Sequence, residues 1–525
     1  MSSLTKRTPG VYIEEIPLFP PSIAAVETAI PAFIGFTQKA ERDGKSIVLE
    51  PTRITSLLEY RNYFGVALPE TTITVEVGDQ TDSSDKLLSR QVNASIGAPS
   101  PHIMFYALQA FYANGGGPCY VVSVGTMKEA GGVIAAEGPP PPGDTSSGDT
   151  SSGDTSSGDA SAGDTSSGDA SAGDASAGKK KYGIVDGINA VEAIDEVTLL
   201  VIPELQHSED YNDIATAALS QCGKLQDRFT ILDIPMPVGE ETILKAAGTF
   251  RSYSLPLDNL KYGAAYTPNV MATFNYQFED SGVTVNQKVT KKIEGGAEVT
   301  DSSFTLDTVK PGEGDTVDAA LYNLALATIN SLEMELPLSP FIAGVYASVD
   351  RTRGVWKAPA NVALANVSRP ARRITNGDQD GLNMDPSGKS INAIRAFTGK
   401  GTLVWGARTL AGNDNEWRYI SVRRFFNMVE ESTKKATEQF VFEPNNANTW
   451  VKVKAMIENF LVNQWRAGAL VGAKQEHAFY VKVGLNETMT AEDILNGYMI
   501  VEIGMAVVRP AEFIILRFSH KMQES

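Results

Sequence analysis

Cysteine, histidine and positive charge are scarce in this sequence. Cys119 and Cys222 are too few for a disulfide framework, so we expect the 525-residue chain to fold in a reducing compartment with both thiols buried as small apolar groups. Asp and Glu outnumber Lys and Arg by 63 to 45, which gives a formal net charge of −18. This acidic balance argues against a general nucleic-acid binder, which would carry a basic footprint.

Long apolar runs are also missing. No stretch reaches about 18 uncharged apolar residues, so the sequence predicts no transmembrane helix. Residues 1–7 lead into Thr8-Pro9-Gly10 and not into an apolar run, which predicts no signal peptide.

Phosphate-binding motifs are incomplete. Gly115-Gly116-Gly117 follows an expected helix and precedes an expected strand, the reverse of the order in a dinucleotide-binding fold. Gly-Lys-Ser occurs at 44–46 and at 388–390, but Lys39 and Asn383 stand where a phosphate-binding loop needs its first glycine. The sequence therefore predicts no cofactor.

Candidate catalytic groups are few. His207, Asp233 and Asp258 fall near the expected parallel strands, where α/β enzymes bind their ligands. No Gly-X-Ser-X-Gly motif accompanies them, and the four histidines of the chain are scattered, so we expect capping or surface roles. We predict no catalytic residue and no metal site.

One long segment has no large apolar residue. Residues 143–178 are seven pentapeptides of the form Gly-Asp-Thr/Ala-Ser-Ser/Ala, closed by Gly178. This composition cannot form a core, so we expect a disordered, solvated tether that projects from the surface. Calcium-binding Gly-Asp repeats have a nine-residue period with apolar positions, and this repeat has neither.

Helices and strands alternate on both sides of the tether. Strands are expected at 29–36, 119–124, 197–202, 229–234 and 260–266, and helices near 104–112 and at 188–194, 211–225 and 240–253. This alternation predicts an α/β fold, with a mainly parallel sheet and helices on both faces. Strands at 362–367, 391–397 and 403–407 return to it. Between them, residues 270–335 suggest an inserted module with a strand at 270–278, a polar middle and a helix at 317–333.

The C-terminal block has a different pattern. Two amphipathic helices are expected within 422–440 and 450–465, on apolar offsets of three and four. The period then changes to two at Phe479–Val483, and the run 498–508 is apolar on both faces apart from Glu502, which predicts a strand inside a sheet.

Both ends of the chain have the character of extended arms. A strand-like segment, 512–518, follows Pro510 and has no later partner in the sequence, and Val11–Ile16 is a short strand ahead of Pro17. Such a strand either folds back on its own sheet or adds to the sheet of another molecule.

Several motifs, in the same order, resemble the tail sheath proteins of contractile phage tails and phage-like contractile injection systems. They are TPGVYIEEI, AFIGFT, ITSLLEYRNYFG, NGGGPCYVV, GVYASVDRTRGVWKAPAN and WRYISVRRFFNMVEESTKKATEQFVFEPNNANTW. The resemblance covers most of the chain outside roughly 138–181 and 279–316.

The resemblance implies a structural subunit and not an enzyme. Such a subunit polymerises helically around an inner tube in a metastable extended state, and contracts to drive the tube through a target cell envelope. The implied partners are other copies of the chain in hexameric rings, the tube protein, baseplate and terminal cap proteins, and sheath paralogues, without nucleic acid and without membrane insertion. Assembly is expected in the bacterial cytoplasm, before release in an extracellular particle or virion.

The resemblance also suggests roles for residues. Linking by strand donation is expected through Val11, Tyr12, Ile13, Ile16, Phe513, Ile515 and Phe518. Positive charge on the two C-terminal helices comes from Arg423, Arg424, Lys434, Lys435, Lys452, Lys454 and Arg466. Because the C-terminal region lies nearest the tube in sheath proteins, we expect Lys452 and Lys454 first to face acidic residues of the tube. Arg351 or Arg353 is expected to bridge to a neighbouring subunit, or else to form an intrachain pair that fixes a turn.

These expectations divide the chain into eight parts. They are an N-terminal linking arm (1–21), the first part of the α/β core (22–142), the repeat (143–178), the second part of the core (179–269), an inserted outward-facing module (270–340), a return to the core (341–400), an α+β C-terminal sheath domain (401–509) and a C-terminal linking arm (510–525). Two alternatives stay open: an α/β hydrolase-like enzyme with a disordered tether, and a passive surface-layer or capsid-like lattice protein.

Overall fold

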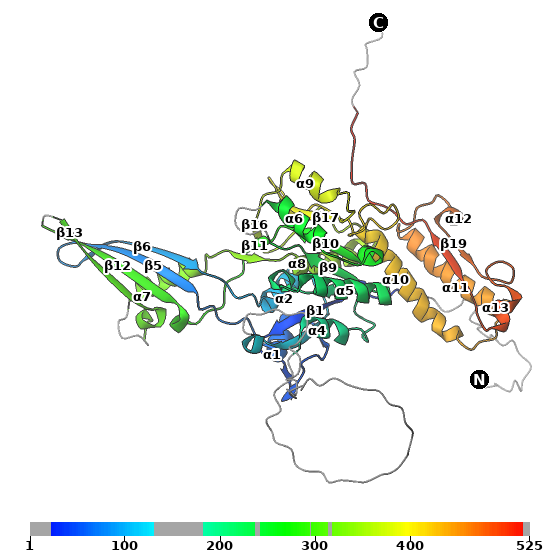
Figure 1. Ribbon diagram of the computed structural model, residues 1–525, viewed down its shortest axis with the longest axis horizontal. Helices are drawn as coiled ribbons and strands as arrows, with labels where there is room; N and C mark the ends of the chain where they lie inside the picture. The colour runs from blue at the N-terminus through cyan, green and yellow to red at the C-terminus, as the bar shows by residue number, and fades with distance from the viewer. Residues whose placement is uncertain (1–22, 131–181, 237–241, 295, 313–317, 518–525) are drawn as a thin grey trace, which may run out of the picture.

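Three bodies follow one another along the molecule. The computed structural model describes residues 23–130, 182–236, 242–294, 296–312 and 318–517. A four-stranded sheet forms one end, a large α/β core lies in the middle, and a mainly helical domain forms the other end (Figure 1). The expected N-terminal arm (1–21) and the pentapeptide repeat (143–178) lie outside the described residues.

The core is built on a nine-stranded, mainly parallel sheet. Its order is β15-β18-β17-β10-β9-β8-β1-β7-β4, and the six strands from β17 to β7 run parallel. The strands are β1 (Pro31–Thr37), β4 (Thr52–Ile54), β7 (Cys119–Thr126), β8 (Leu199–Val201), β9 (Phe229–Asp233), β10 (Gly263–Thr267), β15 (Val362–Ala363), β17 (Ile391–Phe397) and β18 (Gly401–Val404). Both edges are closed by antiparallel strands, β4 on one side and the β18–β15 pair on the other.

Helices cover both faces of this sheet, as predicted. They are α1 (Leu57–Phe64), α2 (Met104–Ala113), α3 (Met127–Ala130), α4 (Ile184–Ala190), α5 (Tyr211–Leu225), α6 (Ile243–Ser252), α8 (Ser339–Arg353) and α9 (Asn376–Asn383). Successive residues of β1 show the two layers, because Phe33 packs edge-on against Phe111 of α2 while Ile34 lies against Gly187 of α4. The mostly apolar strand β1 is therefore buried on both faces.

The predicted core elements recur with shifted boundaries. The bounds of α5 and β17 are those expected, whereas the helix expected at 188–194 is α4, four residues earlier. It begins early because Asp186 accepts a hydrogen bond from the N–H of Gly183 (2.9 Å) and closes the first turn. The strand expected at 270–278 is only β11 (Val270–Ala272), in a small antiparallel sheet with β14 (Met334–Leu336) and β16 (Val367–Pro370).

The outer module draws on two distant parts of the sequence. Its sheet has the order β13-β12-β5-β6, with β5 (Ile73–Thr81), β6 (Leu87–Ile96), β12 (Thr284–Ile293) and β13 (Gly296–Thr305). The sequence prediction had placed 73–96 in the core, but β5 pairs in parallel with β12 over eight residues. One helix, α7 (Ala319–Ile329), packs on one face of this sheet. A small hairpin, β2 (Glu41–Arg42) and β3 (Lys45–Ser46), accounts for the first Gly-Lys-Ser.

The C-terminal domain has its own apolar core. Its elements are α10 (Ile420–Thr437), α11 (Ala447–Arg466), α12 (Gln475–Ala478), α13 (Ala491–Leu495) and the antiparallel pair β19 (Phe479–Lys482) and β20 (Glu502–Met505). Helix α11 starts after the Asn-rich turn because the Asn446 side chain accepts from two N–H groups of its first turn. The expectation of an inner strand over 498–508 was wrong, since β20 is short and stands in a two-stranded sheet with only β19 beside it. No described helix is both long and apolar enough to cross a bilayer.

Candidate assembly surfaces

A buried ion pair fastens the C-terminal domain to the core. Arg424 of α10 donates from Nη2 to Oδ2 of Asp350 in α8 (2.5 Å) and to the carbonyl of Thr28 (2.7 Å). The Thr28 hydroxyl donates to the same carboxylate (2.6 Å), and the guanidinium lies 4.5 Å from the centre of the Tyr346 ring. Both charged side chains are almost fully buried. The N-terminal segment is held in this seam, because the N–H of Val26 also donates to Ser432 of α10 (3.0 Å).

The predicted basic face of α10 is therefore smaller than expected. Arg423 is also buried, 4.2 Å from the centre of the Trp417 ring, and donates to Glu430 (2.7 Å). The two lysines pair with one carboxylate of their own helix, Lys434 at 3.2 Å and Lys435 at 3.4 Å from Glu431. The sequence contains a signal for the burial of the two arginines, because both lie between the buried residues Val422 and Phe425 of α10.

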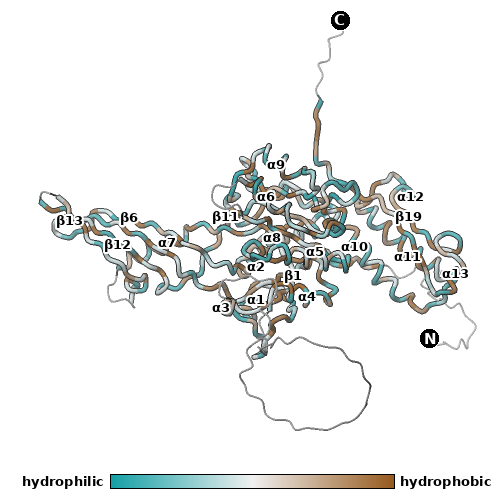
Figure 2. Tube along the Cα trace, viewed as in Figure 1, coloured by the Kyte–Doolittle hydropathy of each residue, from teal (hydrophilic) through white to brown (hydrophobic). Residues whose placement is uncertain are grey.

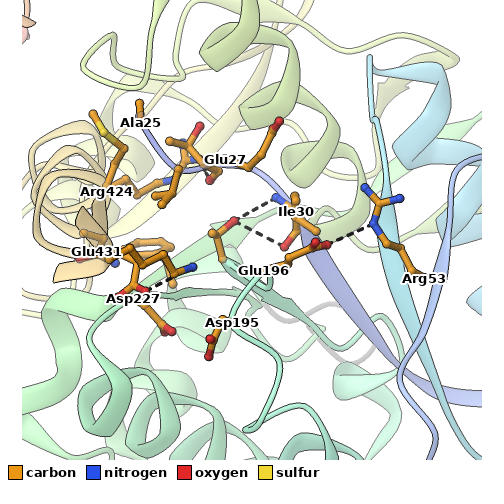
Figure 3. Close-up of a pocket in the computed structure, with 16 residues that line it drawn as sticks. Ala25, Glu27, Ile30, Arg53, Asp195, Glu196, Asp227, Arg424 and Glu431 are labelled. Atoms are coloured by element: carbon orange, nitrogen blue, oxygen red, sulfur yellow. Dashed lines mark hydrogen bonds and ion pairs between the residues drawn. The ribbon is translucent and has the colours of Figure 1, made fainter. Parts of the chain in front are cut away.

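A cavity of about 390 Å³ opens beside the seam (Figure 3). It is lined by the N-terminal segment around Glu27, by the loops that precede β8 and β9, and by α10. Arg53 reaches Glu196 across its margin (3.1 Å). The residues before β8 and β9 enter these parallel strands at their amino ends, opposite the edge at which α/β sheets bind ligands.

The carboxyl ends of the strands are occupied by the protein itself. Asp233, at the end of β9, accepts from the N–H groups of Leu338 (2.8 Å) and Ser339 (2.9 Å) at the start of α8, the capping role expected for it. Burial raises the pKa of Asp233 to about 7. After β8, Glu204 accepts from the N–H of Phe36 (3.1 Å) and lies 3.5 Å from His102, and burial raises its pKa. In the described residues no three His, Cys, Asp or Glu side chains converge as metal ligands.

The two lysines expected to face the tube lie on α11. The helix buries Val453 and Ile457 against the domain core, while Lys452 is exposed and Lys454 is half-buried. Val451 beside them keeps 66% of its surface exposed. Neither lysine has an ion-pair partner among the described residues, so both charges are available to another molecule.

Arg351 and Arg353 are exposed at the end of α8. Arg351 donates to the carbonyl of Gly115 (3.3 Å), and within the described chain neither arginine forms the intrachain ion pair considered as one alternative. The charged residue of this motif that forms an ion pair is Asp350, which pairs with Arg424. The sequence analysis does not single it out.

An apolar groove of about 380 Å³ runs between α10 and the β20 side of the small sheet. The wall on α10 includes Phe426, Val429 and Thr433, and Ile457 of α11 contributes from beneath. The opposite wall is lined by Met499, Val501, Ile503 and Met505, all half-buried. This lining explains why the run 498–508 is so apolar without being an inner strand.

The C-terminal segment leaves the body without folding back. Residues 511–517 form no strand, and Phe513, Ile514, Ile515 and Leu516 keep 70–79% of their surface exposed. Figure 2 shows this stretch as a hydrophobic trace rising away from the molecule. Of the residues expected to link subunits, Phe513 and Ile515 thus have no apolar cover in the single chain. Val11, Tyr12, Ile13, Ile16 and Phe518 lie outside the described residues.

Comparison with known proteins points to one family. Residues 412–521 match the family described as phage tail sheath C-terminal domain. The tail sheath protein of Vibrio phage KVP40 is 25% identical over 171 residues, which are 32% of this chain and 25% of that protein. The chain thus aligns with a quarter of the length of this curated relative.

Two solved structures are similar along nearly their whole length. The sheath complex of the extracellular contractile injection system PVC, in its contracted state, is 28% identical with a TM-score of 0.58, and the match covers 98% of each chain. The helical sheath of the anti-feeding prophage in its contracted state is also 28% identical, with a TM-score of 0.57 over 98% of this chain and 99% of the other. Both likenesses include the core, the outer module and the C-terminal domain.

Proposed function

The chain is a member of the phage tail sheath family, and from this we propose that it is the subunit of a contractile sheath. Copies polymerise helically around an inner tube in a metastable extended state, then contract and drive the tube through a target cell envelope. The observation that carries the proposal is the match, over 98% of both chains, to a sheath in its contracted state. The protein is structural and not an enzyme.

The partners follow from this role. We propose that the chain associates with itself in hexameric rings and with a baseplate, as similarity to a chain in the anti-feeding prophage baseplate suggests. An inner tube protein, a terminal cap and sheath paralogues complete the set. The particle assembles in the bacterial cytoplasm and is then part of a released extracellular particle or virion.

We propose that the apolar groove receives an arm of a neighbouring copy. In the linking segment expected at 513–518, the described residues Phe513–Leu516 are apolar and exposed, and β20 has β19 as its only strand partner in the described chain. A donated strand can hydrogen-bond to the free edge of β20 while its side chains cover Ile503 and Val429. Such an addition hides apolar surface on both copies at once.

The N-terminal arm supplies the second link. Val11, Tyr12, Ile13 and Ile16 are its expected contact residues, and the sequence joins them to the described segment at Ile23 through Pro17 and Pro20-Pro21. Prolines favour an extended connector over compact structure. The two arms act as hinges that keep subunits connected while their bodies rotate, a rigid-body change at interfaces. Arg351 or Arg353 then adds an ion pair to a neighbour.

Electron microscopy of the purified full-length chain, alone and with its tube protein, tests the proposal. We expect hollow, striated tubes, in two forms of different length and diameter. Discrete particles under both conditions would argue for the hydrolase-like alternative, and tubes of a single fixed form would argue for a passive lattice.

A groove variant tests the link. Ile503→Asp should leave a folded monomer that forms no tubes, because a buried carboxylate opposes strand docking. The matched control is Glu502→Gln, next to it on the exposed face of β20, which should assemble normally. Tubes of normal length from Ile503→Asp would remove the groove from the proposal.

A further inference from the structure

Before the exposed C-terminal segment begins, the chain runs from the C-terminal domain to the core. After β20 the N–H of Ala506 donates to the carbonyl of Ala478 (2.8 Å), and Val507 forms an antiparallel bridge with Leu470. The N–H of Val508 donates to Ala469 (3.1 Å). Residues 506–511 therefore run from the C-terminal domain towards the core, and we call them the strap.

The strap ends on a charged anchor in the core. The carboxylate of Glu512 accepts from Arg408 at Nε (3.0 Å) and at Nη2 (2.7 Å), a two-point contact. It also accepts from Asn383 at the end of α9 (3.0 Å) and from the hydroxyl of Tyr419 just before α10 (3.3 Å). Three separate elements thus converge on one side chain, although the backbone at this point runs along the surface.

The anchor is built into the sheet region of the core. The side chain of Arg408 is 5% exposed and that of Glu512 22%. Asn392 of β17 fixes the backbone of Arg408, accepting from its N–H and donating to its carbonyl, each at 2.8 Å. Burial opposes the charge on Glu512, yet hydrogen bonds from Arg408, Asn383 and Tyr419 hold its pKa below the usual range.

Among the described residues after Glu512, nothing comparable holds the side chains. From Phe513 to Leu516 the side chains are 70–79% exposed, so the change from held to free chain takes place within one residue. We propose that the Arg408–Glu512 pair is the mechanical root of the C-terminal arm, so that tension from a linked neighbour is borne by the α/β core and not by the two-stranded sheet. The second half of this inference rests on the proposed function, whereas the first half concerns the single chain.

The anchor protects β20 from a pull on the arm. Only the strap lies between β20 and the arm, so without the anchor a pull on the arm would load the few hydrogen bonds that the strap makes to Ala469 and Ala478, and after them the four-residue strand β20. That sheet also has to accept the arm of another copy. With the anchor, a pull at Phe513 loads an ion pair and two polar contacts together, and β20 keeps its register.

Hydrogen exchange of the monomer tests the anchor. Glu512→Gln should speed exchange of the Ala506 and Val508 amides, which donate hydrogen bonds from the strap, by at least about tenfold, because the strap loses its end point, while exchange in β19 stays unchanged. Arg509→Gln, an exposed position in the same strap, is the matched control and should exchange as the wild type does. Wild-type exchange in the strap of Glu512→Gln would overturn the anchor.

Because Glu512→Gln leaves a buried arginine without its counter-charge, a second variant removes both charges. Arg408→Met/Glu512→Gln should show the same loosened strap with the core intact by circular dichroism; a strap that stays protected in it would also overturn the anchor.

Co-assembly with the tube protein tests the path of tension. Both variants should give shorter tubes than Arg509→Gln, and tubes of full length despite a loosened strap would refute that half of the inference. If the wild type itself forms no tubes, the sheath function fails, and the exchange data on the monomer still decide the anchor.

Discussion

At the scale of single residues, the charged side chains that join the domains are buried, and they lie on helix faces that are otherwise apolar. Arg424 lies on the core-facing side of α10 and is paired with Asp350 across the seam. A buried pair adds little net stability relative to an apolar pair of the same shape, but breaking it by removing one partner is costly. The pair also selects one position of the C-terminal domain, because its two halves belong to α8 and α10.

We predict that Arg424→Ala lowers the free energy of unfolding by about 3–5 kcal/mol, since it strands a carboxylate that is 6% exposed. Urea denaturation followed by tryptophan fluorescence measures the change. Arg353→Ala, an exposed arginine on the neighbouring helix end, is the control and should change stability by less than about 0.5 kcal/mol. Equal effects of the two substitutions would contradict the role of the seam.

A pH prediction concerns Asp233. Burial raises its folded pKa to about 7, above the unfolded value, so its contribution is full at acid pH and is lost as the pH rises towards 7. Asp233→Asn can still accept the two α8 N–H groups but does not titrate. We therefore expect the unfolding free energy of the variant, relative to the wild type, to rise between pH 4 and pH 7 by a few kcal/mol and to level off above. A difference that is independent of pH would disprove the shift.

Residue patterns alone predicted some of this and missed the rest. The capping role of Asp233 follows from its place after a strand, and the exposure of Lys452 follows from helix periodicity. Arg423 and Arg424 were counted as surface charge because composition shows a basic residue but not its partner, and Asp350 is 74 residues away in sequence. The sequence pattern assigns Glu512 to an arm, because its partner Arg408 is likewise distant, 104 residues along the chain.

At the scale of elements, apolar periodicity succeeded where burial is high. The six parallel core strands, α5, α10 and α11 all have large buried faces and were found from the sequence. Strands β6, β12 and β13 were not, because β13 is exposed along nearly its whole length and the others are half-covered. Their sequences are rich in Ser, Thr, Asn and Lys, so they show little alternation of apolar and polar positions. Their pairing is defined by tertiary contacts.

Arg90 joins two strands and the helix of the outer module. Arg90 of β6 makes a two-point contact with Asp79 of β5 (2.8 and 2.8 Å) and a third with Asp318, the N-terminal cap of α7 (2.8 Å). Because Asp79 is 4% exposed, Arg90→Ala leaves it without its counter-charge. We predict faster amide exchange in α7 and β6, by a free energy of about 3 kcal/mol, with the core sheet unchanged.

Lys288→Ala, an exposed position on β12 of the same sheet, serves as control and should leave exchange in α7 as it is. Exchange in α7 that does not respond to Arg90→Ala would show that apolar packing by Leu321 and Ile329 suffices to hold the helix.

At the scale of the whole molecule, the surface that we propose faces an inner tube has to bind it weakly and repeatedly. Exposed ion pairs are each worth about 0–1 kcal/mol and are screened by salt, which suits a contact that is released on contraction. We predict that Lys452→Glu/Lys454→Glu reduces assembly on the tube while the monomer stays folded, and that added salt weakens wild-type assembly in the same direction. Sedimentation of tube-bound subunits measures both effects, and unchanged assembly of the variant would rule out these lysines.

The divided origin of the outer module has a consequence for inheritance. Its central strands β5 and β12 lie more than two hundred residues apart in the chain, yet they are paired along eight positions. A recombination event that replaced only 270–340 would place a foreign β12 against the native β5, and the side chains of these two strands would not be matched to each other. Replacing the whole module, whether by evolution or by engineering, therefore requires two exchanges in the gene made together.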